Sequence, residues 1–577
     1  MPNESKNPAE KASREAREKL LKVLEEGRSF VLEAGAGAGK TYSLVEALKF
    51  LTDRRGAELL RRGQRIACIT YTNVASDEIA ARTDKHPAIL SCTVHAFCWS
   101  LISAFQPALR ARLPFIANWP ARSAEAGGLG ERRVEYNLGY PMIKGDVALL
   151  GHDDVIKLTA SLMAEPKFRQ ILVGRFPIVL IDEYQDTNAE FAEALERYFL
   201  ATGTGPLLGF FGDHWQKIYE SGCGLIRSSA LARINKGANF RSAPAIVGVL
   251  NAMRTELPQA VRDPDAEGTV AVYHTNDWPG ARRTESMWKG DLPPEHSHAY
   301  LSKLVRQLDA EGWGFGSGST KILMLTHRVL AKEQGYDGIV EALENADRFI
   351  QKQDPYIKFL VDTVEPVCVA YQDRQYGEMF DAMGDVPTIG QHSDKLSWAG
   401  DMDRLLDLRA TGTVGDVVKH LSAKQRPRLP EDILTVESHL VAPPPGLSER
   451  DQRRLARARK LLAVPYKEIV ALTKFINEAT PFSTKHGVKG AEFENVLVVF
   501  GRGWAQYDFN KMLEWFAHNV PPASAEVFER NRNLFYVACS RPKRRLALMF
   551  TQQLSSDALG VLRSWFGAAN IHSLGSA

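Results

Sequence analysis

The chain has 577 residues, which at about 150 residues per domain corresponds to roughly three to four domains. Hydrophobic residues make up 44% and charged residues 24%, so a collagenous, low-complexity or wholly disordered chain is excluded. With 72 Lys and Arg against 69 Asp and Glu, the net charge is only +3, and any contact with nucleic acid must come from local basic patches.

The cysteines are thinly spread and point to a reducing compartment. The six of them include no C-x-x-C pair, which is typical of intracellular thiols, so we expect a cytoplasmic protein. The first 22 residues are rich in Glu and Lys and lack the apolar core of a signal peptide. No later stretch approaches the about 18 apolar residues that a membrane helix needs. Secretion and membrane contact are therefore not expected.

The chain begins with a helix and then changes its hydrophobic period. Residues 14–26 have the apolar spacing of an amphipathic helix, whereas residues 30–32 form a short apolar run that enters a glycine-rich turn. A helical pattern resumes at residues 41–51. Similar apolar runs occur at residues 65–70, 178–181 and 207–211. Strands that alternate with helices in this way predict a parallel sheet of the α/β class.

A second series of apolar strand candidates lies further along, at residues 269–273, 322–325, 496–500 and 546–550. These runs suggest a second α/β layer built from discontinuous sequence. Residues 341–475 are mostly helical in pattern, and residues 106–167 are rich in Pro and Gly without a strong strand run. After residue 566 the chain is small and polar, and we expect it to be frayed.

The expected organisation therefore has two α/β cores, each interrupted by a mainly helical accessory insertion. The first core comprises residues 1–105 and 168–235, with a small insertion at 106–167. The second core comprises residues 236–340 and 476–577, with a helical insertion at 341–475.

The glycine-rich turn after the first apolar run has the pattern of a phosphate loop. The segment AGAGAGKT departs from G-x-x-x-x-G-K-[ST] only at its first position, where Ala34 stands. Lys40 can reach the β and γ phosphates and Thr41 can ligate Mg²⁺. Backbone N–H groups of the turn can surround phosphate oxygens, from Gly35, Ala36, Gly37, Ala38 and Gly39. The alternative, a Gly/Ala turn with an incidental lysine, does not explain why strand, turn and helix occur together.

A pair of carboxylates follows the apolar run at residues 178–181. Asp182 would hold the Mg²⁺ ion through water, which leaves Glu183 to polarise the attacking water as general base. An isolated Asp-Glu after an apolar run is more often a helix N-cap. Together with Lys40, however, the pair indicates nucleotide hydrolysis.

The segment at residues 182–187, DEYQDT, resembles motif II of the UvrD/Rep/PcrA-like helicases of superfamily 1. Further blocks follow in that family's order: residues 34–41 (motif I), 70–73 (Ia), 93–97 (Ib), 212–219 (III), 239–242 (IV), 486–493 (V) and 533–541 (VI). These blocks cover most of the chain.

The resemblance implies two RecA-like P-loop cores with ATP between them, and a task for each block. Gln216 would sense the γ-phosphate, Phe240 would stack on adenine, and Glu492 would face the sugar or the triphosphate. Arg241 and Arg541 would be arginine fingers that neutralise charge on the leaving phosphate. For either arginine, the alternative is an ion pair on the surface.

The same resemblance implies contacts with single-stranded or partly duplex DNA through polar groups and stacking aromatic rings. The matching residues are Tyr71, Thr72, Asn73, His95, Phe97, Trp215 and His486. Trp99 is a further stacking candidate, and core packing is an equally good interpretation for Tyr71, Phe97 and Trp99. The basic run at residues 450–460 would grip phosphate or form a solvated helix face.

The sequence departs from the family in three places. Residues 1–30 contain no Gln that could read adenine, and Ser221 stands where the family has a base-stacking aromatic residue. Only 36 residues (577 − 541) follow Arg541, too few for a fused nuclease. Compact UvrD-like proteins of this size resemble the helicase subunits of anti-phage systems such as Gabija, which work beside an OLD-like nuclease.

The leading prediction is an ATP-dependent motor that moves 3′ to 5′ on single-stranded DNA and separates duplex. One alternative is a DNA-activated ATPase that acts as a sensor and regulates a separate nuclease. A helicase that acts on RNA is disfavoured by motif II, and a zinc site is disfavoured because Cys92 and Cys98 have no matching second pair. The pathway, DNA repair or phage defence, stays open.

Overall fold

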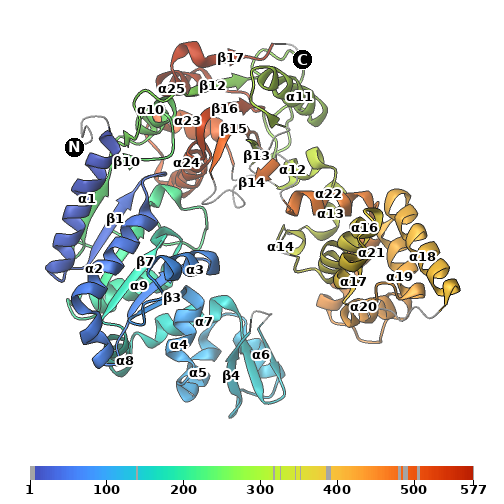
Figure 1. Ribbon diagram of the computed structural model, residues 1–577, viewed down its shortest axis with the longest axis horizontal. Helices are drawn as coiled ribbons and strands as arrows, with labels where there is room; N and C mark the ends of the chain where they lie inside the picture. The colour runs from blue at the N-terminus through green and yellow to red at the C-terminus, as the bar shows by residue number, and fades with distance from the viewer. Residues whose placement is uncertain are drawn as a thin grey trace. The chain divides into compact units, whose positions relative to one another are not determined.

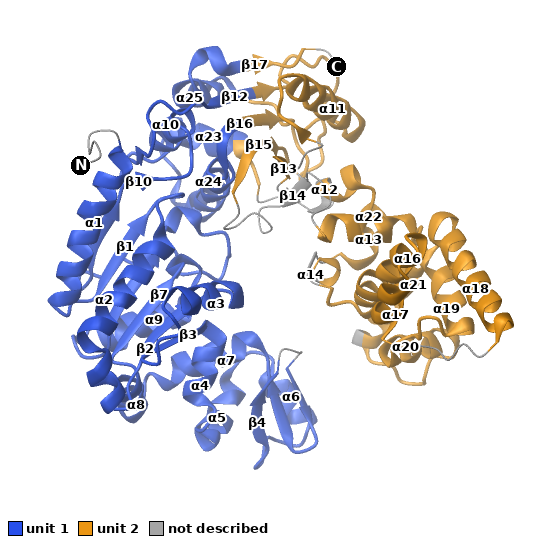
Figure 2. Cartoon of the chain, in the orientation of Figure 1, with its two compact units in different colours: residues 1–272, 510–546, 555–571 blue, residues 273–509, 547–554, 572–577 orange. Residues whose placement is uncertain are grey.

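The computed structural model describes residues 7–137, 141–315, 319–324, 327–344, 346–350, 352–384, 391–477, 482–484, 492–502 and 507–575 (Figure 1). The chain forms two compact units (Figure 2). Unit 1 contains residues 1–272, 510–546 and 555–571, and unit 2 contains residues 273–509, 547–554 and 572–577.

Unit 1 is built on a six-stranded sheet of order β3-β2-β7-β8-β1-β9, in which every neighbouring pair is parallel. Its strands are β1 (Phe30–Ala34), β2 (Ile66–Thr70), β3 (Ile89–Thr93), β7 (Ile178–Asp182), β8 (Leu207–Gly212) and β9 (Ala232–Lys236). All four apolar runs predicted in this part of the chain are strands. The pattern missed β3 and β9, because these edge strands are half-buried or carry polar residues.

Helices cover both faces of this sheet. Because successive side chains of a strand point to opposite faces, Leu32 packs against one helical layer and its neighbour Val31 against the other. The layer beside Leu32 contains α1 (Pro8–Glu25) and α2 (Lys40–Arg61). The opposite layer contains α4 (Val94–Ile102), α7 (His152–Leu162) and α9 (Ala189–Leu195). Two buried faces explain why these strands are continuously apolar.

The small insertion differs from its prediction, because it contains a three-stranded sheet of order β4-β6-β5. The elements are α5 (Gln106–Arg112), α6 (Trp119–Glu125), β4 (Arg133–Tyr136), β5 (Met142–Lys144) and β6 (Val147–Leu150). Strands of three or four residues with alternating burial are too short to give an apolar run. Trp119, Val134 and Leu150 belong to the same hydrophobic core as the first sheet, so the insertion is mixed and packed on that sheet.

Further elements of unit 1 carry the later motifs. They are β10 (Ala238–Asn239), α10 (Pro244–Met253), β11 (Ala260–Val261), α24 (Ala525–Cys539) and α25 (Ser556–Phe566). Helix α10 packs against α24 and α25, so segments almost 300 residues apart in the sequence meet in one unit.

The second six-stranded sheet has the order β14-β13-β15-β16-β12-β17, and β13 is parallel to both β14 and β15. Its strands are β12 (Thr269–His274), β13 (Thr320–Met324), β14 (Phe482–Thr484), β15 (Phe493–Phe500), β16 (Pro542–Phe550) and β17 (Ile571–Ser573). The second series of predicted strands is confirmed, although Leu325 lies outside the described residues. The expectation of a frayed end is wrong, because the edge strand β17 forms there and the Leu574 N–H donates to the His274 carbonyl.

The segment 341–475 is helical, as predicted, and it appears in yellow to orange in Figure 1. Its main helices are α16 (Glu365–Gln372), α17 (Tyr376–Met383), α18 (His392–Thr411), α19 (Val414–Lys424), α20 (Glu431–Val441), α21 (Glu449–Leu462) and α22 (Lys467–Ile476). They share a hydrophobic core of their own. The predicted α/β class with parallel sheets and a helical insertion is confirmed. Within the described ranges, no helix has the length and apolar character to cross a bilayer.

Candidate nucleotide site

The glycine-rich loop joins β1 to α2 and depends on its glycines for two reasons. Gly37 and Gly39 have φ values of 72° and 75°, a left-handed backbone that other residues adopt at a cost. At Gly35 a Cβ atom would lie 2.6 Å from the Gln259 side-chain amide. The tight turn and the close approach of Gln259 therefore explain the run of glycines.

Donors from the segment after β9 hold the carbonyl groups of this loop. The Ala36 carbonyl accepts hydrogen bonds from Gln259 Nε2 at 2.9 Å and from Asn239 Nδ2 at 3.1 Å. The Gly37 carbonyl accepts one from the backbone N–H of Phe240 at 2.9 Å. Because these carbonyls are engaged on that side, the loop can present N–H groups to phosphate oxygens on the other.

The carboxylates predicted after the third strand lie beside this loop. Asp182 ends β7 and is buried, and Lys40 Nζ lies 3.4 Å from Glu183 Oε2. Glu183 has a φ of 47°, a strained backbone that its surroundings must maintain. Mg²⁺ prefers oxygen ligands. The Asp182 carboxylate and the hydroxyl of Thr41, which lies in the first turn of α2, are ligands of this kind.

A chain of hydrogen bonds joins motif II to motif III and motif VI. Gln185 Nε2 donates to Glu183 Oε2 at 2.6 Å, and the Asp213 N–H donates to Gln185 Oε1 at 3.0 Å. Gln216 Nε2 donates to Asp213 Oδ2 at 2.7 Å, and Gln216 Oε1 accepts from Arg541 at 3.1 Å. The candidate base and one candidate arginine finger are thus connected through Asp213.

The two candidate arginine fingers meet in unit 1. Arg541 is 1% exposed and donates to the Val537 carbonyl at 3.0 Å, while Arg241 donates to the Ser540 carbonyl at 3.0 Å. Burial, and then repulsion from Arg241, lower the pKa of Arg541 to about 9. Two like charges beside a phosphate loop, one buried and one half-buried, would be stabilised by a bound anion.

The other residues predicted to contact the nucleotide or DNA near the second core have fewer described contacts with the phosphate loop. Phe240 is half-buried beside the loop. Glu492 is exposed and directly precedes β15 in unit 2. His486 lies outside the described residues.

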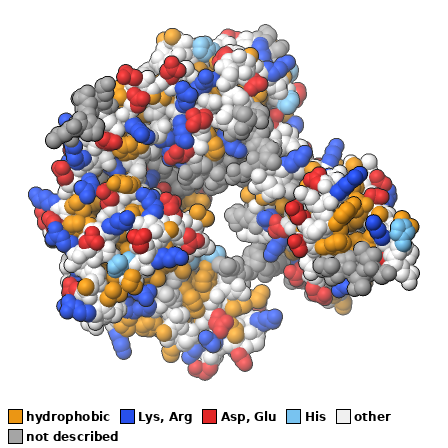
Figure 3. Space-filling model, in the orientation of Figure 1, with side chains coloured by type: hydrophobic (Ala, Val, Ile, Leu, Met, Phe, Trp, Pro, Cys, Tyr) orange, Lys and Arg blue, Asp and Glu red, His pale blue; other side chains and the backbone are white. Residues whose placement is uncertain are grey.

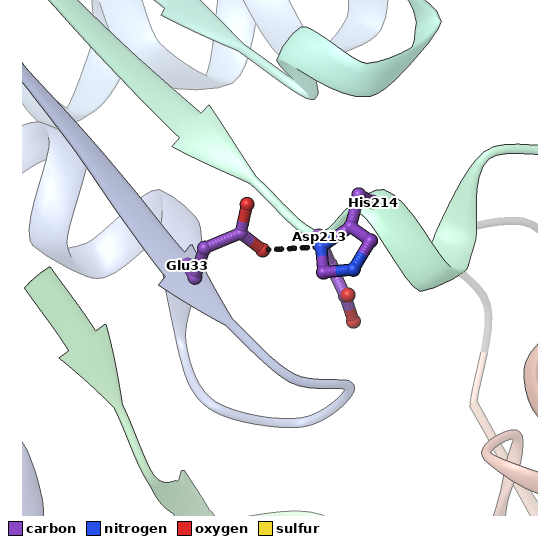
Figure 4. Close-up of side chains that lie close together, drawn as sticks. All are labelled: Glu33, Asp213 and His214. Carbon is purple, nitrogen blue, oxygen red and sulfur yellow. Dashed lines mark hydrogen bonds and ion pairs between the residues drawn. The ribbon is translucent and has the colours of Figure 1, made fainter. Parts of the chain in front are cut away.

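One group of metal-binding type occurs in the part of the chain that the structure describes: Glu33, Asp213 and His214, whose ligand atoms lie within 4.8 Å of one another. Figure 4 shows the Glu33 carboxylate pointing to His214 Nδ1, at 3.1 Å. The guanidinium of Arg254 already pairs with Asp213 at 2.5 Å and with Glu33 at 3.6 Å. Because a cation is present, we assign no metal to this group.

Of the predicted DNA residues, those at the end of β2 are exposed. Tyr71 is 41% exposed and stacks on Tyr219, with ring centroids 4.9 Å apart and an angle of 26°. The Thr72 hydroxyl caps α3 (Asn73–Arg82), and Asn73 is exposed in its first turn. On the face shown in Figure 3, basic and acidic side chains are intermixed, in agreement with the small net charge.

His95 lies half-buried in the first turn of α4, and its ring centroid is 4.5 Å from that of His152. Burial, followed by His152, lowers the pKa of His95 to about 4, so its imidazole is neutral at pH 7. Trp99 packs against Tyr136, with ring centroids 6.0 Å apart. These rings form one aromatic group at the base of the small insertion.

Phe97 and Trp215 have packing roles in the structure, in place of the DNA contacts expected from the motifs. Phe97 is 1% exposed and packs edge-on against Phe176 in the core. Trp215 is 5% exposed, and its ring lies against the guanidinium groups of Arg532 and Arg254, at 4.2 and 5.5 Å. Their faces are therefore covered.

The basic run lies on α21, which is amphipathic. Leu455 and Leu461 are buried in the helical core, while Arg453 pairs with Glu449 at 2.7 Å on the exposed side. This arrangement corresponds to the solvated-face alternative.

The sequence analysis missed several residues that contact the site. Lys236 is buried at the end of β9, where Nζ donates to the Gly39 carbonyl at 3.2 Å and to Ser43 Oγ at 2.8 Å. Burial lowers the pKa of Lys236 to about 8, against the opposing effect of Glu46. Gln259 and Arg254 were also missed. The partners of all three residues in the site lie far away in the sequence, so no sequence spacing identifies them.

Comparison with known proteins supports the motif analysis. Residues 18–222 match a family model described as an AAA domain. The Gabija protein GajB from Bacillus cereus (strain HuB5-5) is 23% identical over 684 aligned residues, which cover 95% of this chain and 96% of that protein. A crystal structure of Pif1 helicase from Candida albicans shares 18% identity, covering 41% of this chain and 43% of that chain, with a TM-score of 0.23, an overlap too limited to inform the fold. The chain is thus similar along nearly its whole length to a Gabija-type protein, and the resemblance to UvrD-like helicases of superfamily 1 that its motifs predicted is confirmed.

Proposed function

We propose that this chain is an ATP-dependent DNA motor that translocates 3′ to 5′ on single-stranded DNA and uses Mg-ATP hydrolysis to separate strands. The observation that carries the proposal is the collection of cationic side chains at the phosphate loop. Lys40 lies against Glu183, and the half-buried Arg241 repels the buried Arg541, which contributes to the low pKa of Arg541. A triphosphate would relieve that repulsion, and the charge that develops on it during hydrolysis would be stabilised further.

Each residue then has a task in hydrolysis. Backbone N–H groups of the loop and Lys40 bind the β and γ phosphates. Phe240 would stack on adenine, and Glu492 would face the sugar or the triphosphate. Thr41 and Asp182 would hold Mg²⁺, which neutralises charge on the phosphates when bound.

Glu183 accepts a proton from the attacking water, and its hydrogen bond with Gln185 orients it for this step. Gln216 contacts the γ-phosphate. Because Gln216 accepts a hydrogen bond from Arg541, this contact couples the γ-phosphate to the position of Arg541. The arginine then stabilises the leaving phosphate.

The DNA surface that we propose begins at the end of β2. Tyr71 is exposed and already stacked on Tyr219, so a DNA base can extend this stack. Thr72 and Asn73 offer polar groups to the backbone, and His95 and His486 would add contacts further along. Phe97 and Trp215 are left out of this surface because they are buried.

The first experiment is steady-state ATP hydrolysis by the purified chain with and without single-stranded DNA, with Lys40→Ala as the control. Strong stimulation by DNA that the substitution abolishes is the expected result. Hydrolysis that requires Lys40 but is indifferent to DNA would keep the nucleotide site and contradict the motor. Displacement of a labelled strand from a 3′-overhang but not from a 5′-overhang duplex would then test polarity.

A second candidate is a DNA-activated ATPase that regulates a separate, OLD-like nuclease in anti-phage defence. Similarity to the Gabija protein over 95% of this chain favours it, as does Ser221, which stands where related motors have an aromatic residue. ATP hydrolysis without strand displacement, with displacement restored only by an added nuclease subunit, would support this candidate over an autonomous motor.

A further inference from the structure

Arg254 is one of the largest fully buried side chains of the described chain, and it directly follows α10. Its guanidinium lies 2.5 Å from Asp213 Oδ1 and 3.6 Å from Glu33 Oε2. The rings of Trp215 and Tyr536 lie 5.5 and 5.9 Å from the guanidinium carbon. A third carboxylate, that of the exposed Glu256, accepts from Arg254 Nε at 3.2 Å. The arginine is therefore held by two buried carboxylates, one exposed carboxylate and two aromatic rings, and is itself only 2% exposed.

This cluster keeps Asp213 ionised although Asp213 is completely buried. Burial by itself opposes ionisation, but Arg254 in the first place, followed by Lys40 and the hydrogen bond from Gln216, lower the pKa of Asp213 below its usual value. The hydroxyl of Tyr184 donates to the second carboxylate, Glu33. If Arg254 were removed, two carboxylates would stay buried without their cation, which is costly.

Asp213 is also the point where two hydrogen-bond chains meet. Its backbone N–H reaches Glu183 through Gln185, and its Oδ2 atom reaches Arg541 through Gln216. The other carboxylate oxygen, Oδ1, is the atom that Arg254 contacts. The backbone N–H of Trp215 donates to the same oxygen at 3.1 Å, so Arg254 and this N–H together fix the orientation of the carboxylate that accepts from Gln216.

We propose that Arg254 is a positioning residue for ATP hydrolysis, which fixes Asp213 so that Glu183 and Arg541 are aligned with the γ-phosphate at the same time. This inference rests on the proposed ATPase function, and nothing in the sequence motifs marks Arg254. Its effect is on turnover: the phosphate loop and Lys40, which bind ATP, have their own supports in Gln259, Asn239 and Lys236.

The test measures kcat, the KM for ATP and the melting temperature of the full chain for the wild type, Arg254→Met and Arg254→Lys. We expect Arg254→Met to lower kcat about 100-fold, the scale of a misplacement of about 1 Å in an active site, with the KM for ATP changed less than about threefold. Arg254→Lys keeps the charge but cannot contact Asp213 and Glu33 together, so it recovers only part of the loss.

Arg409→Met is the matched control, because Arg409 also pairs with a buried carboxylate, that of Glu365 in the helical insertion. We expect this variant to be destabilised but to retain the kcat of the wild type at temperatures where it is folded. An Arg254→Met protein with wild-type kcat would overturn the proposal, as would an equal loss in Arg409→Met. If Arg254→Met does not fold, Arg254→Lys decides, since wild-type turnover in that variant would contradict positioning. A wild type that hydrolyses no ATP would instead overturn the proposed function itself.

Discussion

Two arginine–carboxylate pairs, one in each unit, resemble each other in the burial of the carboxylate and differ in connectivity. In unit 1, Arg254 contacts Asp213 and Glu33. In unit 2, Arg409 on α18 donates from Nε and a terminal nitrogen to the two oxygens of Glu365, at 2.9 and 2.8 Å. Both carboxylates are almost completely buried, so each requires its arginine.

The second pair uses both carboxylate oxygens in one forked contact between two helices. In the first pair the contacts of Asp213 are divided: Oδ1 accepts from Arg254 and the Trp215 N–H, Oδ2 accepts from Gln216, and the backbone N–H donates to Gln185. Burial and charge pairing alone therefore do not distinguish a residue of the site from a residue that joins helices. What distinguishes them is whether the carboxylate has further partners that reach the nucleotide.

The largest effect on turnover is expected at Glu183, which Asp213 reaches through Gln185. Glu183→Gln removes the proton acceptor and should lower kcat about 1,000-fold, within the range for a general base. Binding of ATP should be retained, because Lys40 no longer faces a negative charge. Steady-state kinetics and equilibrium binding of a fluorescent ATP analogue measure the two quantities. Glu190→Gln, an exposed residue of α9, is the control, and more than a tenth of wild-type turnover in Glu183→Gln would contradict the assignment.

A smaller effect on turnover is expected at Arg541, which Asp213 reaches through Gln216. Arg541→Lys keeps a positive charge but cannot donate at once to Val537, Ser540 and Gln216, so kcat should fall about 100-fold. Steady-state turnover at saturating ATP and DNA measures this loss. Arg544→Lys, three residues along on an exposed part of β16, should be unchanged. Equal losses in the two variants would show that Arg541 acts through general charge and not through its geometry.

The difference between the two pairs also shows what the sequence could predict. The central strands and the phosphate loop were predictable, because two buried faces require apolar runs and a tight turn requires Gly37 and Gly39. Residues such as Arg254 and Gln259 were not, because their partners are brought together only by the fold. Aromatic residues were ambiguous for a similar reason: Tyr71 and Phe97 both lie in motifs, yet Tyr71 is exposed and Phe97 is buried against Phe176.

The smallest effect on activity is expected for Arg409→Met, whose consequence should be confined to stability. Removing the arginine leaves Glu365 buried without its partner, and the free energy of unfolding should fall by about 3 kcal/mol. Denaturant unfolding followed by circular dichroism measures the loss, with ATP turnover as the parallel readout.

A second substitution, Glu365→Gln, tests whether the Arg409–Glu365 pair contributes to stability alone, in contrast to the Arg254–Asp213 pair. In the background of Arg409→Met it removes the uncompensated charge and should restore part of the stability, because Glu365 needs nothing beyond its arginine. The corresponding change, Asp213→Asn with Arg254→Met, should restore only part of the stability, because Glu33 stays buried without Arg254. It should not restore turnover, because the carboxylate accepts from Gln216 at one oxygen and from the Trp215 N–H at the other, whereas an amide has only one acceptor oxygen. Recovery of turnover in that double variant would mean that Asp213 is held only for charge balance, and the contrast between the two pairs would disappear.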